Sequence, residues 1–407
     1  MITTINNEHK ELNFSSEREQ SQACLNSAEH EKNQGRKVLN VPNLRFPEFQ
    51  GEWSVTTLQK DCIVNPTNEK IADKFVYVDL ESVKQGQLYK YQILTKDNAP
   101  SRAQRVLHTD DILFQCVRPY QMNNYMVKGT MSDIQWVAST GYAQIRTQTD
   151  YPAFLYYVLN TSKYNKAVMV RCTGSSYPAI NSEDLSKIPF YKCGIAEQKK
   201  IADFLSLLDE RIATQNKIID KLQSLIKGIA QHCIRELING WEYVRLGDIC
   251  KITTGKLDAN AQVENGKYPF FTCAERPFNI DSYAFDTEAL LISGNGANLG
   301  YINYYKGKFN AYQRTYILDH FSVNIQYVKW ALKVLLPQRI AIEKSSSNTP
   351  YIVLSTLADL KIPIPNNSKQ NHIADLMMSF ERKLSTQLVL SDLYNKQKQY
   401  LLRQMFI

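Results

Sequence analysis

The stretch EQKKIADFLSLLDERIATQNKIIDKLQSLIKGIAQHCI, residues 197–234, contains no proline and a single glycine, Gly228. Positions separated by alternating steps of four and three residues carry apolar side chains in nine of ten cases. This is the a/d pattern of a heptad repeat, and it predicts a long helix that pairs with another helix. The predicted seam consists of Ile201, Leu205, Leu208, Ile212, Gln215, Ile219, Leu222, Ile226, Ile229 and Cys233.

A second helix with the same pattern is predicted 172 residues further on, where Gln370 matches Gln198. Its seam is weaker, because Gln387, Ser391 and Lys398 interrupt it. Gln387 is the equivalent of Gln215, and a polar residue in a seam fixes register at some cost in stability. The alternative, that each helix only covers its own domain, stays open. The apolar or shared seam positions are Ile373, Met377, Phe380, Leu384, Gln387, Tyr394, Leu401 and Met405.

The globular parts of the chain repeat as well. GEWSVTTLQKDC (51–62) matches GWEYVRLGDIC (240–250) at an offset of 188, which aligns Trp53 with Trp241 and Cys62 with Cys250. Further matches at the offset of 172 are Pro178 with Pro350, Ile180 with Ile352 and Leu185 with Leu357. The chain is therefore predicted to be a duplication, in which a globular domain is followed by a long helix twice.

The predicted fold class is α+β. KFVYVDLESV (74–83) and DILFQCVRPY (111–120) have the β-branched and aromatic content of strands, whereas YPAFLYYVLNTSKYNKAV (151–168) has helical spacing. In the second copy TEALLISGNGANLG (287–300) and VKWALKVLLP (328–337) take these places. The predicted boundaries are a polar tail expected to be disordered (1–40), a first domain (41–190), a central helix (191–238), a second domain (239–366) and a C-terminal helix (367–407).

The composition is that of a water-soluble protein. Of 407 residues 43% are hydrophobic, yet no apolar run reaches the ~18–20 residues of a membrane span, so the cytoplasm is expected. The net charge of +8 permits contacts with DNA phosphates. Eight cysteines without a CxxC pair, and six histidines without paired spacing, predict no metal site.

Motifs for catalysis are missing. The chain has no Pro-Pro dipeptide, which the target-base loop of amino-methyltransferases needs, and TTGK (253–256) lacks the first glycine of a phosphate-binding loop. SGNGANLG (293–300) has glycine spacing close to a dinucleotide fingerprint. YINYYKGKF (301–309) after it has strand character, which predicts a tight loop whose backbone N–H groups contact phosphate instead.

VPNLRFPEFQGEW (41–53), VASTGYAQIR (137–146), LSTLADLKIPIP (354–365) and KQKQYLLRQMF (396–406) resemble specificity subunits of type I restriction-modification systems. The resemblance implies two target-recognition domains, each recognising half of a bipartite double-stranded DNA target. It also implies that the helices pair as an antiparallel coiled coil that sets the spacer. Two modification subunits, which use S-adenosylmethionine to methylate adenine N6, and two restriction subunits, which use ATP and Mg, would then join.

In this interpretation the chain has no catalytic residue and binds no cofactor itself. Two alternatives are a self-contained methyltransferase or nuclease, and a coiled-coil interaction protein or silent copy without DNA binding. DNA contacts need Arg, Asn and Gln for bases and Lys, Ser and Thr for phosphates. The candidates are Arg118, Tyr120, Gln121, Asn123, Asn124, Thr173, Ser175, Ser176, Tyr177, Thr254, Lys256, Asn295, Asn298, Gln313, Arg314, Lys344, Ser346 and Asn348.

Overall fold

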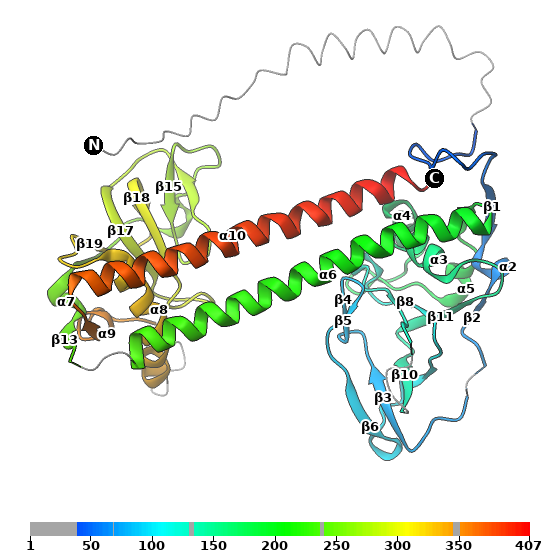
Figure 1. The fold of residues 1–407 in the computed structure, drawn as a ribbon, viewed down its shortest axis with the longest axis horizontal. Coiled ribbons are helices and arrows are strands. Elements are labelled where there is room, and N and C mark those ends of the chain that lie inside the picture. The colour runs from blue at the N-terminus through cyan, green and yellow to red at the C-terminus, as the bar shows by residue number, and fades with distance from the viewer. Residues whose placement is uncertain (1–38, 68, 130–133, 237–239, 345–350) are drawn as a thin grey trace, which may run out of the picture. The chain divides into compact units, whose positions relative to one another are not determined.

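The computed structural model describes residues 39–67, 69–129, 134–236, 240–344 and 351–407 (Figure 1). The predicted polar tail lies outside these residues up to position 38. The chain forms two units: the first contains the residues up to Leu207 together with Lys398–Ile407, and the second contains Leu208–Gln397. No helix in the described part of the chain is both long and apolar enough to span a membrane.

The first unit is built on two four-stranded sheets with the orders β6-β3-β10-β7 and β2-β11-β8-β9. The strands predicted within 74–83 and 111–120 are confirmed as β3 and β8, and all four residues of β8 are buried. The strands are β2 (Cys62–Val64), β3 (Lys74–Val78), β6 (Gln92–Thr95), β7 (Ala103–Val106), β8 (Ile112–Gln115), β9 (Tyr125–Met126), β10 (Gln135–Ser139) and β11 (Tyr142–Thr147). A small hairpin, β4 (Val83–Lys84) and β5 (Gln87–Leu88), packs against this framework through Val83 and Leu88.

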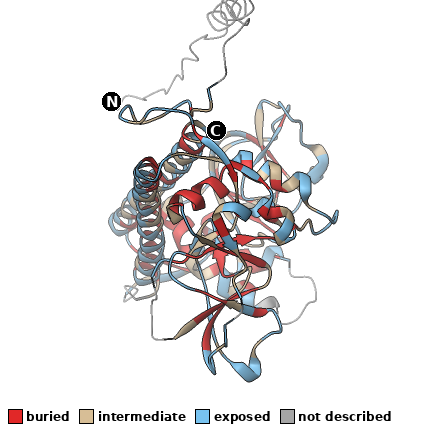
Figure 2. Ribbon diagram, turned by 90° about the vertical axis from the view of Figure 1, so that its right-hand side faces the viewer, coloured by how far each residue is buried: buried red, intermediate tan, exposed pale blue. Residues whose placement is uncertain are grey.

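The helical segment predicted at 151–168 is two helices, α3 (Pro152–Leu159) and α4 (Ser162–Arg171). The break occurs because the Thr161 hydroxyl accepts a hydrogen bond from the Tyr164 N–H, which caps a new helix. Every residue of α3 after Pro152 is buried, so this helix belongs to the core of the first unit. Figure 2 shows the buried residues of the chain in red. The short helices α2 (Leu58–Asp61) and α5 (Ser182–Ser186) complete the unit.

The second unit contains one six-stranded sheet with the order β14-β19-β17-β18-β15-β16. Strand β18 follows directly on the glycine-rich loop 294–300, so the strand predicted there is confirmed and a dinucleotide fingerprint is excluded. The strands are β14 (Lys251–Thr254), β15 (Tyr268–Phe271), β16 (Phe278–Ile280), β17 (Phe285–Ser293), β18 (Ile302–Ala311) and β19 (Thr315–Asp319). The helices are α7 (Leu246–Ile249), α8 (Ile325–Lys344) and α9 (Leu354–Ala358).

The duplication is confirmed by matching contacts in the two units. In each, the first strand pairs antiparallel with the last: β1 (Ser54–Thr57) with β12 (Pro189–Lys192), and β13 (Glu242–Arg245) with β20 (Lys361–Ile364). The Ile180 N–H donates to the Cys116 carbonyl at 3.0 Å, and the Ile352 N–H donates to the Gly294 carbonyl at 2.9 Å. The same backbone bond therefore closes the loop after β8 and the loop after β17.

The predicted long helices are α6 (Ile195–Gln231), which ends in a turn of π-helix at His232–Glu236, and α10 (Asn367–Gln404). The seam of α6 is buried at every position from Ile201 to Ile226, and Ile229 is half-buried. The weaker seam of α10 is buried at Ile373, Met377 and Leu401 and half-buried at Phe380, Leu384, Gln387 and Tyr394.

Within the second unit α6 and α10 run antiparallel. The Gln215 side chain donates to the Gln387 side chain at 2.8 Å, and the Arg211 guanidinium donates to the Tyr394 hydroxyl at 2.9 Å. The end of α6 and the start of α10 also enter the core of this unit, where Leu222, Ile226, Ile373 and Met377 pack with α8. Each helix is thus both a seam partner and part of a globular core.

Candidate nucleic-acid interface

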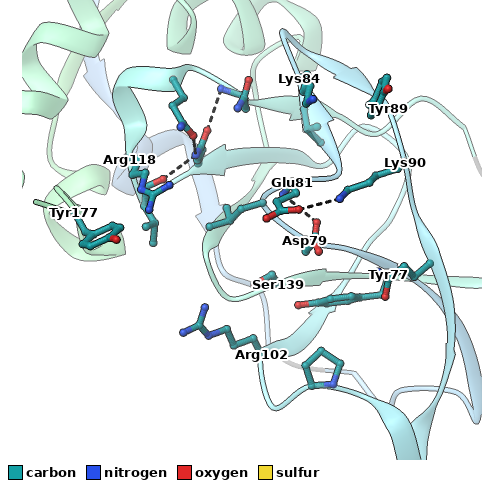
Figure 3. A pocket seen from close by; sticks show the side chains of 18 of the residues that line it. Tyr77, Asp79, Glu81, Lys84, Tyr89, Lys90, Arg102, Arg118, Ser139 and Tyr177 are labelled. Atoms are coloured by element: carbon teal, nitrogen blue, oxygen red, sulfur yellow. Dashed lines mark hydrogen bonds and ion pairs between the residues drawn. The ribbon is translucent and has the colours of Figure 1, made fainter. Parts of the chain in front are cut away.

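The first unit has a cleft of about 1120 Å³ between the β4–β5 hairpin, the ends of β3 and β10, and the loops after β6 and β8. Figure 3 shows Arg118 and Tyr177 on one side of this cleft and Glu81 and Lys90 on the other. Four of the predicted DNA-contacting residues line it, namely Arg118, Gln121, Asn123 and Tyr177. Segments 118–124 and 173–177, which are far apart in sequence, are therefore brought together.

Backbone hydrogen bonds hold these two segments side by side. The Arg118 N–H donates to the Pro178 carbonyl at 2.8 Å, and Val117 forms a β-bridge with Ala179. The guanidinium of Arg118 lies over the Tyr177 ring, 4.5 Å from its centroid. Such a cation–π contact holds a guanidinium plane while leaving its N–H groups available.

A network of amides fixes the loop that carries Arg118. The Gln115 side-chain amide donates to the Val117 carbonyl and to the Gln121 side chain, both at 2.8 Å. The Asn123 side chain accepts from the Gln85 N–H at 3.1 Å, which ties the loop to the β4–β5 hairpin. The walls of the cleft are therefore connected by hydrogen bonds that do not depend on a ligand.

The cleft carries charges of both signs, with basic side chains in excess. Lys84, Lys90, Arg102 and Arg118 line it, against Asp79 and Glu81. Lys90 pairs with Glu81 at 2.9 Å, and this hydrogen bond raises the pKa of Lys90 above its ordinary value. The Asp79 carboxylate accepts from the Ser82 hydroxyl at 2.9 Å.

In the second unit the candidate residues gather where β14, β17 and β19 meet their loops. The Gly294 N–H donates to the Arg314 carbonyl at 2.8 Å, the Gln313 side chain to Asp258 at 2.9 Å, and the Asn298 side chain to the Cys273 carbonyl at 3.0 Å. Gly294 is needed there, since an added Cβ would lie 2.4 Å from the Arg314 oxygen. Asn295, Asn298, Gln313 and Arg314 thus belong to one loop cluster.

The comparisons with known proteins agree with this duplicated arrangement. A family model described as the type I restriction modification DNA specificity domain matches residues 63–224 and again 238–389. The chain belongs to this family. Two specificity domains thus follow one another, and each match combines a globular part with most of a long helix.

Among the curated relatives of this specificity-domain chain is the type I restriction enzyme EcoDI specificity subunit of Escherichia coli. It is 43% identical over 135 residues, which are 33% of this chain and 30% of the relative. The MjaIX specificity subunit of Methanocaldococcus jannaschii is 24% identical over 251 residues, 52% of this chain and 58% of the relative. The chain therefore spans less than two thirds of the length of either relative.

Solved structures share the fold of the specificity-domain chain. The S subunit of a type I restriction-modification system from M. genitalium superposes with a TM-score of 0.61 at 18% identity and covers 90% of this chain and 99% of its own. A chain from a structure on complex assembly and conformational transition of the type I R-M system gives 0.54 at 22% identity, with coverage of 89% and 98%.

Several predicted DNA contacts of the first specificity domain lie outside the cleft. The prediction that Asn124 contacts DNA is wrong, because this residue is only 1% exposed. Its side-chain oxygen accepts a hydrogen bond from the Gln115 N–H at 2.9 Å, and its side-chain amide donates to Asn160. Asn124 therefore stabilises the loop from the interior. Tyr120, Thr173, Ser175 and Ser176 are exposed but do not line the cleft.

In the second specificity domain Thr254, Lys256, Gln313 and Arg314 are exposed, and Asn295 and Asn298 are half-buried. The expected phosphate contact of the glycine loop is not available at Gly294, because its N–H is bonded internally. The side chain of Lys344, together with Ser346 and Asn348, lies outside the described residues.

Sequence reasoning missed Lys84, Tyr89, Lys90 and Arg102, which line the same cleft of the first specificity domain. The alternation of basic and aromatic residues in KQGQLYKY (84–91) was a signal that could have indicated the first three. Arg102 carried none, since an isolated arginine in a turn is most often a solvated charge. Within the described ranges, no group of three or more His, Cys, Asp or Glu side chains is placed to hold a metal ion.

Proposed function

We propose that this chain is the DNA-recognition subunit of a type I restriction-modification complex and has no chemistry of its own. Each specificity domain recognises one half of a bipartite double-stranded DNA target. The paired helices α6 and α10 set the unread spacer and dock two modification subunits. Those subunits bind S-adenosylmethionine and methylate adenine N6, and two restriction subunits that use ATP and Mg join the complex in the cytoplasm.

One observation carries the proposal: the chain presents two copies of one framework, each with polar loops at the same place. The loop after β8 and the loop after β17 are closed by equivalent hydrogen bonds from Ile180 and Ile352. Side chains of the types that contact bases and phosphates lie on these loops and on neighbouring loops, among them Arg118 and Arg314. Two copies of one DNA-recognition framework match a DNA target with two half-sites.

The test is to produce the chain together with its modification subunits in cells that lack other adenine methylation, and to map N6-methyladenine by single-molecule sequencing. We expect a bipartite motif that appears only when this chain is present. A stable complex without methylated sites would contradict the proposal and favour an interaction protein that does not bind DNA. Methylation by the chain alone, with S-adenosylmethionine, would instead make it an enzyme.

A further inference from the structure

We propose that Arg118, held against Tyr177, recognises a guanine in the half-site of the first specificity domain. This inference rests on the DNA-recognition role proposed above and assigns one base to one side chain. Three observations support it. The guanidinium has no hydrogen-bond partner among the described residues, its loop is held by hydrogen bonds, and the cleft contains both acidic and basic side chains.

The guanidinium of Arg118 has donors to spare. Among the described residues it forms no hydrogen bond or ion pair, and its contact is with the Tyr177 ring. Other arginines of the chain are satisfied by carboxylates: Arg45 by Glu197 at 2.7 Å, and Arg146 by Asp111 at 2.8 Å. A guanidinium carries five N–H donors, so the side chain of Arg118 can donate several hydrogen bonds to a ligand in the cleft.

The backbone at Arg118 is held in a conformation that side chains seldom adopt. Arg118 has a φ of 56° and Met122 a φ of 52°, and the two residues enclose a single 3-10 turn, Pro119–Gln121. The amide network of Gln115 and the bond to Pro178 hold this turn in place. A side chain on such a support loses little freedom when it binds, which favours geometric discrimination over simple charge attraction.

The rest of the lining favours a base edge over a phosphate as the partner of Arg118. Glu81 is paired with Lys90, but Asp79 shares the cleft with Arg118 without an ion pair among the described residues, and its carboxylate would repel a phosphate. A base edge in the major groove offers amino groups as well as acceptors, so carboxylates and guanidinium groups can both be used. Guanine presents O6 and N7 to the major groove, and the arginine fork matches this pair in a bidentate contact. Lys84 and Arg102, which are exposed, suit the phosphates.

The test compares methylation motifs for the full chain and for Arg118→Ala, Arg118→Lys and Arg171→Ala, each produced with the modification subunits. Arg171 is a matched control, because it is exposed on α4 outside the cleft and bonds the Ala167 carbonyl of its own helix. We expect both Arg118 variants to relax one G·C position in one half-site, with discrimination falling by about one to two orders of magnitude. The other half-site and the motif of Arg171→Ala should be unchanged.

Two results would overturn the inference while leaving the proposed function standing. One is an unchanged motif for Arg118→Ala, and the other is a decrease in methylation that is uniform over all sites, as expected for a phosphate contact or a folding defect. Tyr177→Leu gives a second check that leaves Arg118 in place, and it should weaken discrimination at the same position. No bipartite motif with the unaltered chain would overturn the proposed function and this inference together.

Discussion

Gln198 and Gln370 are equivalent in the two repeats and make equivalent bonds. The Gln198 side chain accepts from the Tyr151 N–H at 2.8 Å and donates to the Cys193 carbonyl at 2.9 Å. The Gln370 side chain accepts from the Asn324 N–H at 3.0 Å and donates to the Pro365 carbonyl at 2.8 Å. Each glutamine therefore joins the start of a buried domain helix, α3 or α8, to the segment that leads into a long helix.

Replacing these glutamines by leucine should destabilise the chain. Gln198→Leu leaves the Tyr151 N–H and one bond of the Asp150 carboxylate unsatisfied, since Gln198 also donates to Asp150 at 2.8 Å. A cost of about 1–3 kcal/mol for each buried group is expected. Gln370→Leu should cost less, because no charged partner is involved. Urea unfolding followed by circular dichroism measures both, with the exposed Gln399→Leu as control. Equal stability of Gln198→Leu and the control would contradict this account.

The sequence predicts such residues unevenly. The match of Gln198 with Gln370 at an offset of 172 is visible in it, but not which backbone groups they bond. Asn123 and Asn124 have the same side chain, yet the first lines the cleft and the second is buried. The two asparagines differ in burial because the turn at Pro119–Gln121 sets the direction in which the backbone continues. This direction depends on φ and ψ, which residue type alone does not determine.

Among the elements, the seam of α6 and α10 has a polar contact between repeat equivalents. The Gln215 amide donates to the Gln387 side-chain oxygen at 2.8 Å and to its carbonyl at 3.1 Å. Next to this pair the Ser391 hydroxyl donates to Asn216 at 3.0 Å. This pair therefore joins repeat-equivalent positions of α6 and α10, and a polar contact of this kind fixes the register of their seam.

Gln215→Leu alone should lower the free energy of unfolding by about 1 kcal/mol, because it deprives half-buried Gln387 of its partner. The double variant Gln215→Leu/Gln387→Leu should recover this stability or exceed it, since two apolar residues pack where an amide pair stood. The four chains form a double-mutant cycle measured by urea unfolding. Additive effects of the two single variants would mean that the amides do not act as a pair.

The long helices are the elements that the sequence predicts best, because a heptad pattern is long and regular. The spacing at 151–168 predicts one helix, whereas Thr161 caps a second helix there. The heptad pattern of α10 is weaker because, near Met377, this helix also packs against α8 and the sheet in the core of the second unit. Its side chains therefore contact a globular domain as well as α6.

On the scale of the whole molecule, the two candidate surfaces belong to different units. Arg118 stands in the first unit and Arg314 in the second, on the exposed turn between β18 and β19. The net charge of +8 cannot distinguish these surfaces from the rest of the chain. Sequence patterns predict the duplication and the polar loops, while the cleft depends on how strands from distant segments pair.

Because each domain is proposed to recognise its own half-site, Arg314→Ala should relax the half of the motif that Arg118→Ala leaves intact. Removing the Arg314 guanidinium from a base edge should reduce discrimination at one position by about 1–3 kcal/mol. In the double variant the two effects should simply add, since residues without shared partners act independently. N6-methyladenine mapping measures all three chains, with Arg171→Ala, exposed on α4 and outside the cleft, as a control of equal charge. If both arginines altered the same half-site, the assignment of one half-site to each domain would be wrong, because a single domain would then contain both sets of contacts.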